Sequence, residues 1–123
     1  MKHKVRVGVA YIVGCLLGDS NTPSSVYDYD NGKYTSISGD VSSSEVNVYD
    51  YGMSCYITGN GQNSEYSIYH YGTGKYINLS INKSQGTFNG YDYDSGKHFN
   101  GDVKNNSISI YDYDTSKYYR FTI

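Results

Sequence analysis

The chain has 123 residues, which is enough for one domain, and its net charge is −2. Tyrosine is exceptionally abundant at 17 residues and glycine reaches 14, whereas proline occurs once and tryptophan is absent. This composition favours short strands joined by turns, because aromatic residues have a high β propensity. The basic residues are scattered and form no positive stripe, so nothing in the sequence indicates a nucleic-acid partner.

The first fifteen residues differ in character from the rest of the chain. Residues 1–6 are basic, and residues 7–14 form an apolar run too short to span a bilayer, an order typical of export signals. Ile12-Val13-Gly14-Cys15 resembles the lipobox of bacterial lipoprotein signal peptides. The resemblance implies that residues 1–14 are a signal peptide, that Cys15 is lipidated, and that residues 15–25 form a flexible tether. Leu16 would then favour sorting to the outer membrane of a Gram-negative cell.

Two alternatives concern the same cysteine. Residues 1–15 can instead form an N-terminal strand in which Cys15 is simply buried. Cys15 and Cys55 are the only cysteines, so lipidation of Cys15 would leave Cys55 as a free thiol. In an exported protein the other possibility is a disulfide between the two.

From residue 26 onward the chain repeats one pattern five times. Each unit has an aliphatic residue or glycine, then Tyr-x-Tyr, a polar turn and, in four units, a lysine. The leading tyrosines are spaced by 22, 20, 22 and 20 residues and are Tyr27, Tyr49, Tyr69, Tyr91 and Tyr111. A period of about 21 residues marks a repeat array whose units must stack on one another to bury their apolar faces.

Each unit is predicted to be a β-hairpin. Asn31-Gly32 is the dipeptide preferred at the centre of a type I′ turn, which would place Tyr29 opposite Tyr34. The same register applied to all five units puts tyrosines on one face and aliphatic residues on the other. We therefore predict an all-β domain over residues 26–123, in which five tandem antiparallel hairpins form one twisted, extended sheet. The alternative is a closed ten-stranded barrel, which would leave no free edges.

The fourth unit, residues 86–103, resembles a MORN repeat, because it places Gly-Tyr before a turn ending in glycine, followed by an aromatic residue and another glycine. This resemblance implies an antiparallel sheet that serves as a scaffold and as a contact surface for proteins or lipids. Weaker likenesses are to the tyrosine–aspartate repeats of large secreted toxins and to the choline-binding repeats of cell-wall proteins.

The tyrosine-bearing face is the candidate binding site. Cross-strand aromatic pairs can stabilise a sheet without any ligand, but rigid amphipathic rings also suit stacking on sugars or docking of a protein. The predicted binding residues are Tyr27, Tyr29, Tyr34, Tyr49, Tyr51, Tyr56, Tyr69, Tyr71, Tyr76, Tyr91, Tyr93, Tyr111, Tyr113 and Tyr118, with His98 on the same face.

The sequence predicts no enzyme, cofactor or metal site. Asp28 and Asp30 have the spacing that begins many calcium loops, but no glutamate follows at the twelfth position. The cysteines and histidines lack zinc-ligand spacing, and no hydrolase motif is present. A repeated pattern also argues against an active site, which needs residues that occur once.

These features together predict an exported, lipid-anchored protein of the bacterial cell envelope. Its tyrosine-rich sheet would bind a protein or a carbohydrate, or act as a scaffold. The alternatives are a secreted form without the anchor, a curli-like subunit that self-associates through its edge strands, and a small hydrolase.

Overall fold

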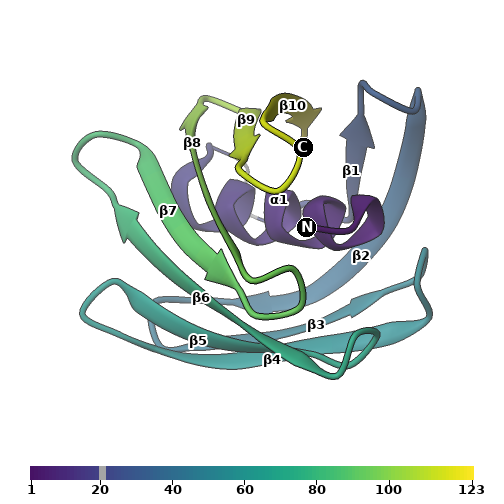
Figure 1. Cartoon of the computed structure of the whole chain (residues 1–123). Coiled ribbons are helices and arrows are strands. Elements are labelled where there is room, and N and C mark those ends of the chain that lie inside the picture. The colour runs from purple at the N-terminus through teal and green to yellow at the C-terminus, as the bar shows by residue number, and fades with distance from the viewer. Residues whose placement is uncertain (20–21) are drawn as a thin grey trace.

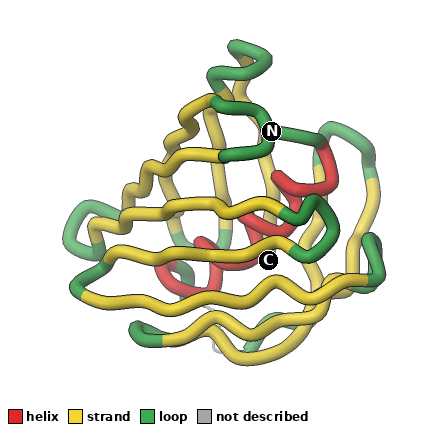
Figure 2. Tube along the Cα trace, turned by 60° about the horizontal axis from the view of Figure 1, so that its bottom comes forward, coloured by secondary structure: helices red, strands yellow, loops and turns green. Residues whose placement is uncertain are grey.

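A computed structural model describes residues 1–19 and 22–123, within which the chain forms one helix and ten strands. The helix, α1 (His3–Leu17), lies inside a barrel formed by all ten strands (Figures 1 and 2). The strands are β1 (Ser25–Asp28), β2 (Lys33–Val41), β3 (Glu45–Asp50), β4 (Cys55–Gln62), β5 (Glu65–His70), β6 (Lys75–Asn82), β7 (Thr87–Asp92), β8 (Lys97–Lys104), β9 (Ser107–Asp112) and β10 (Lys117–Thr122).

The strands confirm the all-β class and the hairpin repeat, but the predicted open sheet is wrong. Successive strands pair in antiparallel order, and β1 then pairs with β10 to close the barrel. The backbone N–H of Tyr29 adds a hydrogen bond of 3.2 Å to the carbonyl oxygen of Arg120 across this seam. Closure removes both sheet edges and encloses the aliphatic face in a lumen. The alternative prediction of a closed ten-stranded barrel is therefore confirmed.

The hairpin register differs from the predicted one by two residues. Tyr27, not Tyr29, lies opposite Tyr34, and Asp28 lies opposite Lys33, so four residues form the turn. The cause is the side chain of Asp28, whose Oδ1 accepts a hydrogen bond of 2.9 Å from the backbone N–H of Asp30 and stabilises an Asx turn. A shift by an even number leaves every side chain on its predicted face. The division into a tyrosine face and an aliphatic face is therefore confirmed.

The lumen explains the position of α1. Eight strands enclose a space that their own side chains just fill, so a barrel of ten strands needs additional material inside. The helix supplies it, because α1 is apolar on all sides after Arg6 and residues 5–14 are buried. Gly8 lets the helix approach the wall, since a Cβ atom there would lie 2.8 Å from Cδ1 of Ile57.

The structure thus gives a second role to the segment that resembles a signal peptide. Residues 5–14 form the centre of the hydrophobic core, and Cys15 is half-buried in the last turn of α1. In the part of the chain described, no helix has the length and apolar character needed to cross a membrane. The predicted tether includes Ser20 and Asn21, which lie outside the described residues.

Candidate functional site

The fourteen predicted tyrosines and His98 lie together on the outer surface and form what we call the tyrosine girdle. They are grouped in five clusters, one per hairpin, and in each cluster a central tyrosine contacts two neighbouring rings edge-on. In the first cluster, the ring centre of Tyr27 is 4.9 Å from that of Tyr29 and 4.7 Å from that of Tyr34. Such T-shaped contacts are the preferred geometry of aromatic pairs.

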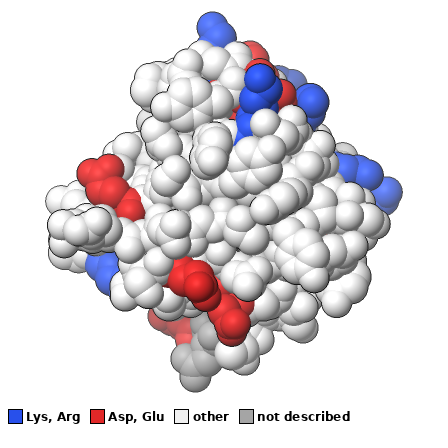
Figure 3. Space-filling view, turned by 90° about the horizontal axis from the view of Figure 1, so that it is seen from below, with Lys and Arg blue, Asp and Glu red and all other residues white. Residues whose placement is uncertain are grey.

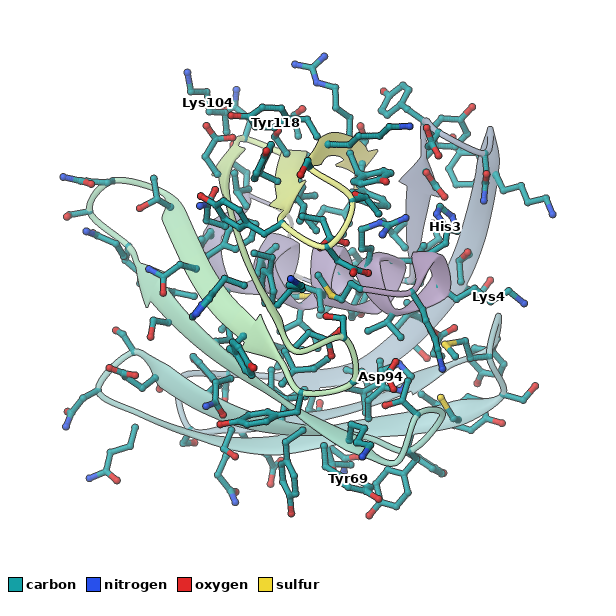
Figure 4. All side chains as sticks on the ribbon, in the orientation of Figure 1. His3, Lys4, Tyr69, Asp94, Lys104 and Tyr118 are labelled. Atoms are coloured by element: carbon teal, nitrogen blue, oxygen red, sulfur yellow. The ribbon has the colours of Figure 1, made fainter. Side chains whose placement is uncertain are left out.

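The outer rings of these clusters remain in contact with solvent. Nine tyrosine side chains are 50% to 74% exposed, namely Tyr29, Tyr34, Tyr51, Tyr56, Tyr71, Tyr76, Tyr93, Tyr113 and Tyr118. The girdle is not the flat platform expected for an open sheet, because closure of the barrel turns the clusters in different directions. Figure 4 shows this for two labelled rings, since Tyr69 and Tyr118 lie on opposite sides of the barrel.

The three tyrosines outside the predicted set are buried instead. Each satisfies its hydroxyl with an internal acceptor, as buried tyrosines usually do. Tyr11 donates to the carbonyl oxygen of Pro23 (2.6 Å), Tyr66 donates to that of Ser42 (2.9 Å), and Tyr119 donates to Oγ1 of Thr115 (2.9 Å). Strand parity separates Tyr66 and Tyr119 from the girdle tyrosines, whereas Tyr11 is buried because it lies on α1.

Grooves with polar floors run between neighbouring clusters. One groove, of about 440 Å³, lies between the second and third units and is lined by Thr58, Gly59, Asn60, Ser67, Tyr69, Tyr71 and Tyr76. The next, of about 370 Å³, is lined by Ser67, Tyr76, Asn78 and Tyr93. Nδ2 of Asn78 donates a hydrogen bond of 3.1 Å to the hydroxyl of Tyr93, and Asn100 and Tyr113 repeat this pair one unit later at 3.2 Å. Each groove thus combines aromatic walls with amide and hydroxyl groups.

A second group of polar side chains points into the lumen, at the end where α1 begins. We call it the acidic ring, and it consists of Asp28, Asp50, Asp92 and Asp112, with His70 at the equivalent position of the third unit. Each of these residues lies between two girdle tyrosines, so alternation directs it inward. The sequence analysis considered Asp28 for a calcium loop and did not predict the ring, although the inward parity of Asp28 was readable.

The basic start of the chain neutralises part of this ring. Nη1 of Arg6 lies 2.8 Å from Oδ2 of Asp112, and Nε2 of His3 lies 2.6 Å from Oδ2 of Asp28. The amino group of Met1 lies 3.0 Å from carboxylate oxygens of both Asp112 and Asp114. The basic residues and the apolar run of the first fifteen residues therefore match the acidic rim and the apolar lumen of the barrel.

Burial changes the titration of several groups inside the barrel. It raises the pKa of Cys15 from 9.0 to about 11, because the thiolate would be poorly solvated there. Burial also raises the pKa of Asp50, partly offset by hydrogen bonds from the backbone N–H groups of Met53 and Gly52. Both Cys15 and Cys55 are free thiols, so the alternative of a disulfide between them is not formed.

The described chain offers no conventional metal centre, since no three histidine, cysteine, aspartate or glutamate side chains in residues 1–19 and 22–123 are grouped to hold an ion. No family model matches the chain, no curated protein matches its sequence, and no solved structure matches its fold. The resemblance to MORN repeats and to a lipoprotein signal peptide therefore stays a prediction.

Proposed function

We propose that this protein is a binding module whose tyrosine girdle recognises an uncharged carbohydrate chain. The observation that carries the proposal is the exposure of nine girdle tyrosines by half or more of their surface. Pairing within a sheet does not require rings to remain exposed, and contiguous exposed aromatic surface is typical of contact sites. The rings are held rigid by their T-shaped contacts, so little conformational entropy would be lost on binding.

The chemistry of the grooves favours a carbohydrate. The apolar face of a sugar ring stacks on an aromatic side chain, while its hydroxyls need nearby donors and acceptors. Asn60, Ser67 and Asn78 supply such groups on the groove floors beside Tyr71 and Tyr76. Figure 3 shows a face of the molecule on which charged side chains are few and separated, which favours a neutral ligand over an anionic one.

We also propose that the protein acts at the bacterial cell envelope. Support comes from the order of basic, apolar and Gly-Cys residues in 1–15, which is that of a lipoprotein leader. Removal of residues 1–14 would take away the filling of the lumen, so leader cleavage and the helix-filled barrel exclude each other for one molecule. Intact-mass analysis of protein from the native membrane fraction distinguishes them: lipidation gives an acyl-modified mass beginning at Cys15, and the filled barrel gives the full chain.

Self-assembly is a second candidate, favoured by one observation. The seam between β1 and β10 has only two paired positions, Tyr27 with Thr122 and Asp28 with Phe121, the fewest of any neighbouring strands. Opening of this seam would expose two strand edges able to pair with another copy. Electron microscopy across a concentration series tests it, and fibrils that grow with concentration would favour a fibre subunit over a monomeric binder.

Calorimetric titration with a panel of neutral polysaccharides tests the carbohydrate proposal. Tyr71→Ala combined with Tyr76→Ala should weaken binding of the preferred polysaccharide at least about tenfold, the effect of losing one contact of about 1.4 kcal/mol. Tyr76→Phe keeps the ring and should bind nearly as well as the unchanged protein. Lys104→Ala, on the outer surface away from Tyr69 (Figure 4), is the control. Failure to bind any member of the panel would refute the proposal.

A further inference from the structure

The second and third hairpins depart from the repeat at a few positions, and these departures lie together in space. Cys55, in the second unit, stands where the other four units have lysine. His70, in the third unit, stands where the first, second, fourth and fifth units have aspartate. Met53 occupies a turn position that is otherwise asparagine, threonine or serine. Gly52 and Gly72 replace the aspartate found at the same place in the other units. Residues that occur once in a repeat protein are candidates for a role that repetition cannot supply.

These side chains converge on Gly72. A Cβ atom built on Gly72 would lie 2.9 Å from Cε1 of His70, 3.0 Å from Cε of Met53 and 3.1 Å from Sγ of Cys55. An aspartate at this position, as in the first, fourth and fifth units, would therefore collide with all three side chains. The glycine keeps open the space between a thiol, a thioether and an imidazole.

The imidazole of His70 is held in one orientation. The side chain is buried, with 1% of its surface exposed, and its Nδ1 accepts a hydrogen bond of 3.1 Å from the backbone N–H of Gly72. The sulfur of Cys55 also lies beside this residue, 3.1 Å from the position of a Cβ atom built on Gly72. The imidazole nitrogen and the thiol sulfur thus both lie beside Gly72. Nε2 of His70 then carries the ring proton, and it has no hydrogen-bond partner among the described protein atoms.

The charge around this point is also unbalanced. In the first, fourth and fifth units, the aspartate of the acidic ring lies opposite a lysine across the hairpin. Asp50 instead lies opposite Cys55, and its Oδ2 is buried without a hydrogen-bond partner in the described chain. The second hairpin has therefore lost the cation that its sister units carry. The nearby cation is Lys4 of α1, which borders a cavity of about 40 Å³ together with Asp50, Met53 and Gly52.

We propose that Cys55 Sγ, Met53 Sδ and His70 Nδ1 bind a soft monovalent metal cation, Cu(I). Thiolate and thioether sulfurs select Cu(I), and imidazole also suits copper. Zinc is a poor fit, because it prefers thiolate, imidazole and carboxylate ligands and the third donor here is the thioether of Met53. On binding, the cation replaces the Gly72 N–H as the partner of Nδ1 of His70, and the thiol proton leaves to solvent. No electron is transferred. Asp50 balances the charge from nearby, and Nε2–H of His70 stays available to a carboxylate, as is common for metal-bound histidine.

Access to the site is consistent with this role. Cys55 and Met53 are half-buried at the rim of the barrel, so an ion can enter from solvent, whereas His70 anchors the site from inside. The adjacent cavity of about 40 Å³ is large enough for a water molecule or an ion. The proposal is independent of carbohydrate binding, because the girdle rings point outward and these three donors do not belong to the girdle.

The test is a competition between the full chain and a chromophoric Cu(I) chelator, under anaerobic and reducing conditions. The unchanged protein should take up one Cu(I) per chain, with X-ray absorption showing two sulfur ligands and one nitrogen ligand. Cys55→Lys and His70→Asp should each lower the affinity by about 100-fold or more, a larger loss than that for a supporting group. Both substitutions restore the residue that the other units carry at that position, so the fold should persist. Met53→Thr, also a restoration, should cost about tenfold.

Two further variants test whether Cu(I) binding requires this site or only a thiol group. Cys15→Ser should bind Cu(I) as the unchanged protein does. Cys55→Lys combined with Lys97→Cys moves the thiol to the fourth hairpin, where His98 points outward with the girdle and the turn has no methionine. This double variant should not restore the affinity. The proposal is overturned if the unchanged protein cannot compete with the chelator, if Cys55→Lys still binds one equivalent tightly, or if the relocated thiol binds equally well.

Discussion

Replacement of Ile12 by alanine is the sharpest measurement of whether α1 fills the barrel in solution. Ile12 is 1% exposed in the middle of the helix. The change removes three carbon atoms from the core, worth about 2.4 kcal/mol at about 0.8 kcal/mol each. The cavity left behind brings the expected loss to about 3–4 kcal/mol. Alanine is the better helix former of the two residues, so a loss of stability cannot come from helix propensity.

Urea unfolding of the full chain at neutral pH measures this loss. A domain of this size is stable by about 5–15 kcal/mol, so the midpoint should move by a large and easily resolved amount. Leu17→Ala, in the half-buried last turn of α1, is the control and should cost clearly less. If Ile12→Ala unfolds at the same urea concentration as the unchanged protein, α1 does not occupy the lumen and the account of the core is wrong.

Three other expectations use the same unfolding assay. Arg6→Met should destabilise the protein by about 3 kcal/mol, because the buried negative charge of Asp112 loses the guanidinium that pairs with it. Adding Asp112→Asn should recover much of that loss. No recovery would mean that the pair is not coupled. Because the pKa of Cys15 is raised from 9.0 to about 11, the folded state holds the thiol proton more tightly, so stability should fall as pH rises from about 9 toward 11. Cys15→Ser should remove that part of the slope, and an unchanged slope would contradict burial of the thiol. Tyr49→Ala removes the central ring of two T-shaped pairs and should lower the free energy of unfolding by about 1–2 kcal/mol. Tyr51→Ala removes one pair and should lower it by less than about 1 kcal/mol. Equal losses would show that the clusters are not organised around the central ring.

The hairpins were predictable because their evidence is local. Alternation alone places Tyr27 outside and Val26 inside, and it does so for every unit. The register was off by two residues because the dipeptide rule for Asn31-Gly32 competes with side-chain capping by Asp28, and the carboxylate determines the turn. Closure depends on twist summed over ten strands, which no single hairpin reveals.

The position of α1 was hidden for a different reason. A short basic and apolar segment has the same composition whether it is read as an export signal or lies within a lumen. Only the width of a ten-stranded barrel creates the need for an internal helix, and that width is a property of the assembled sheet. The carboxylates that receive Arg6 and His3 lie more than 20 residues away in sequence, so no local pattern connects them.

The girdle was predicted residue by residue, whereas the cluster around Gly72 was not. Its signal was present in the sequence as departures from the repeat at Met53, Cys55 and His70. What the sequence could not supply was their meeting point, because it depends on the neighbouring hairpins lying side by side in the observed register.

The helix inside the barrel also restricts how this chain can change its length during evolution. Open repeat arrays gain or lose units with little penalty, because each unit contacts only its neighbours. In this protein, the circumference of the barrel must leave an interior as wide as one helix. Loss of a hairpin would leave eight strands, which have no space for α1, and gain of a hairpin would leave a gap around it. Duplication and deletion of units should therefore be rare among its descendants. The number of hairpins should stay at five even where the sequences of the hairpins diverge.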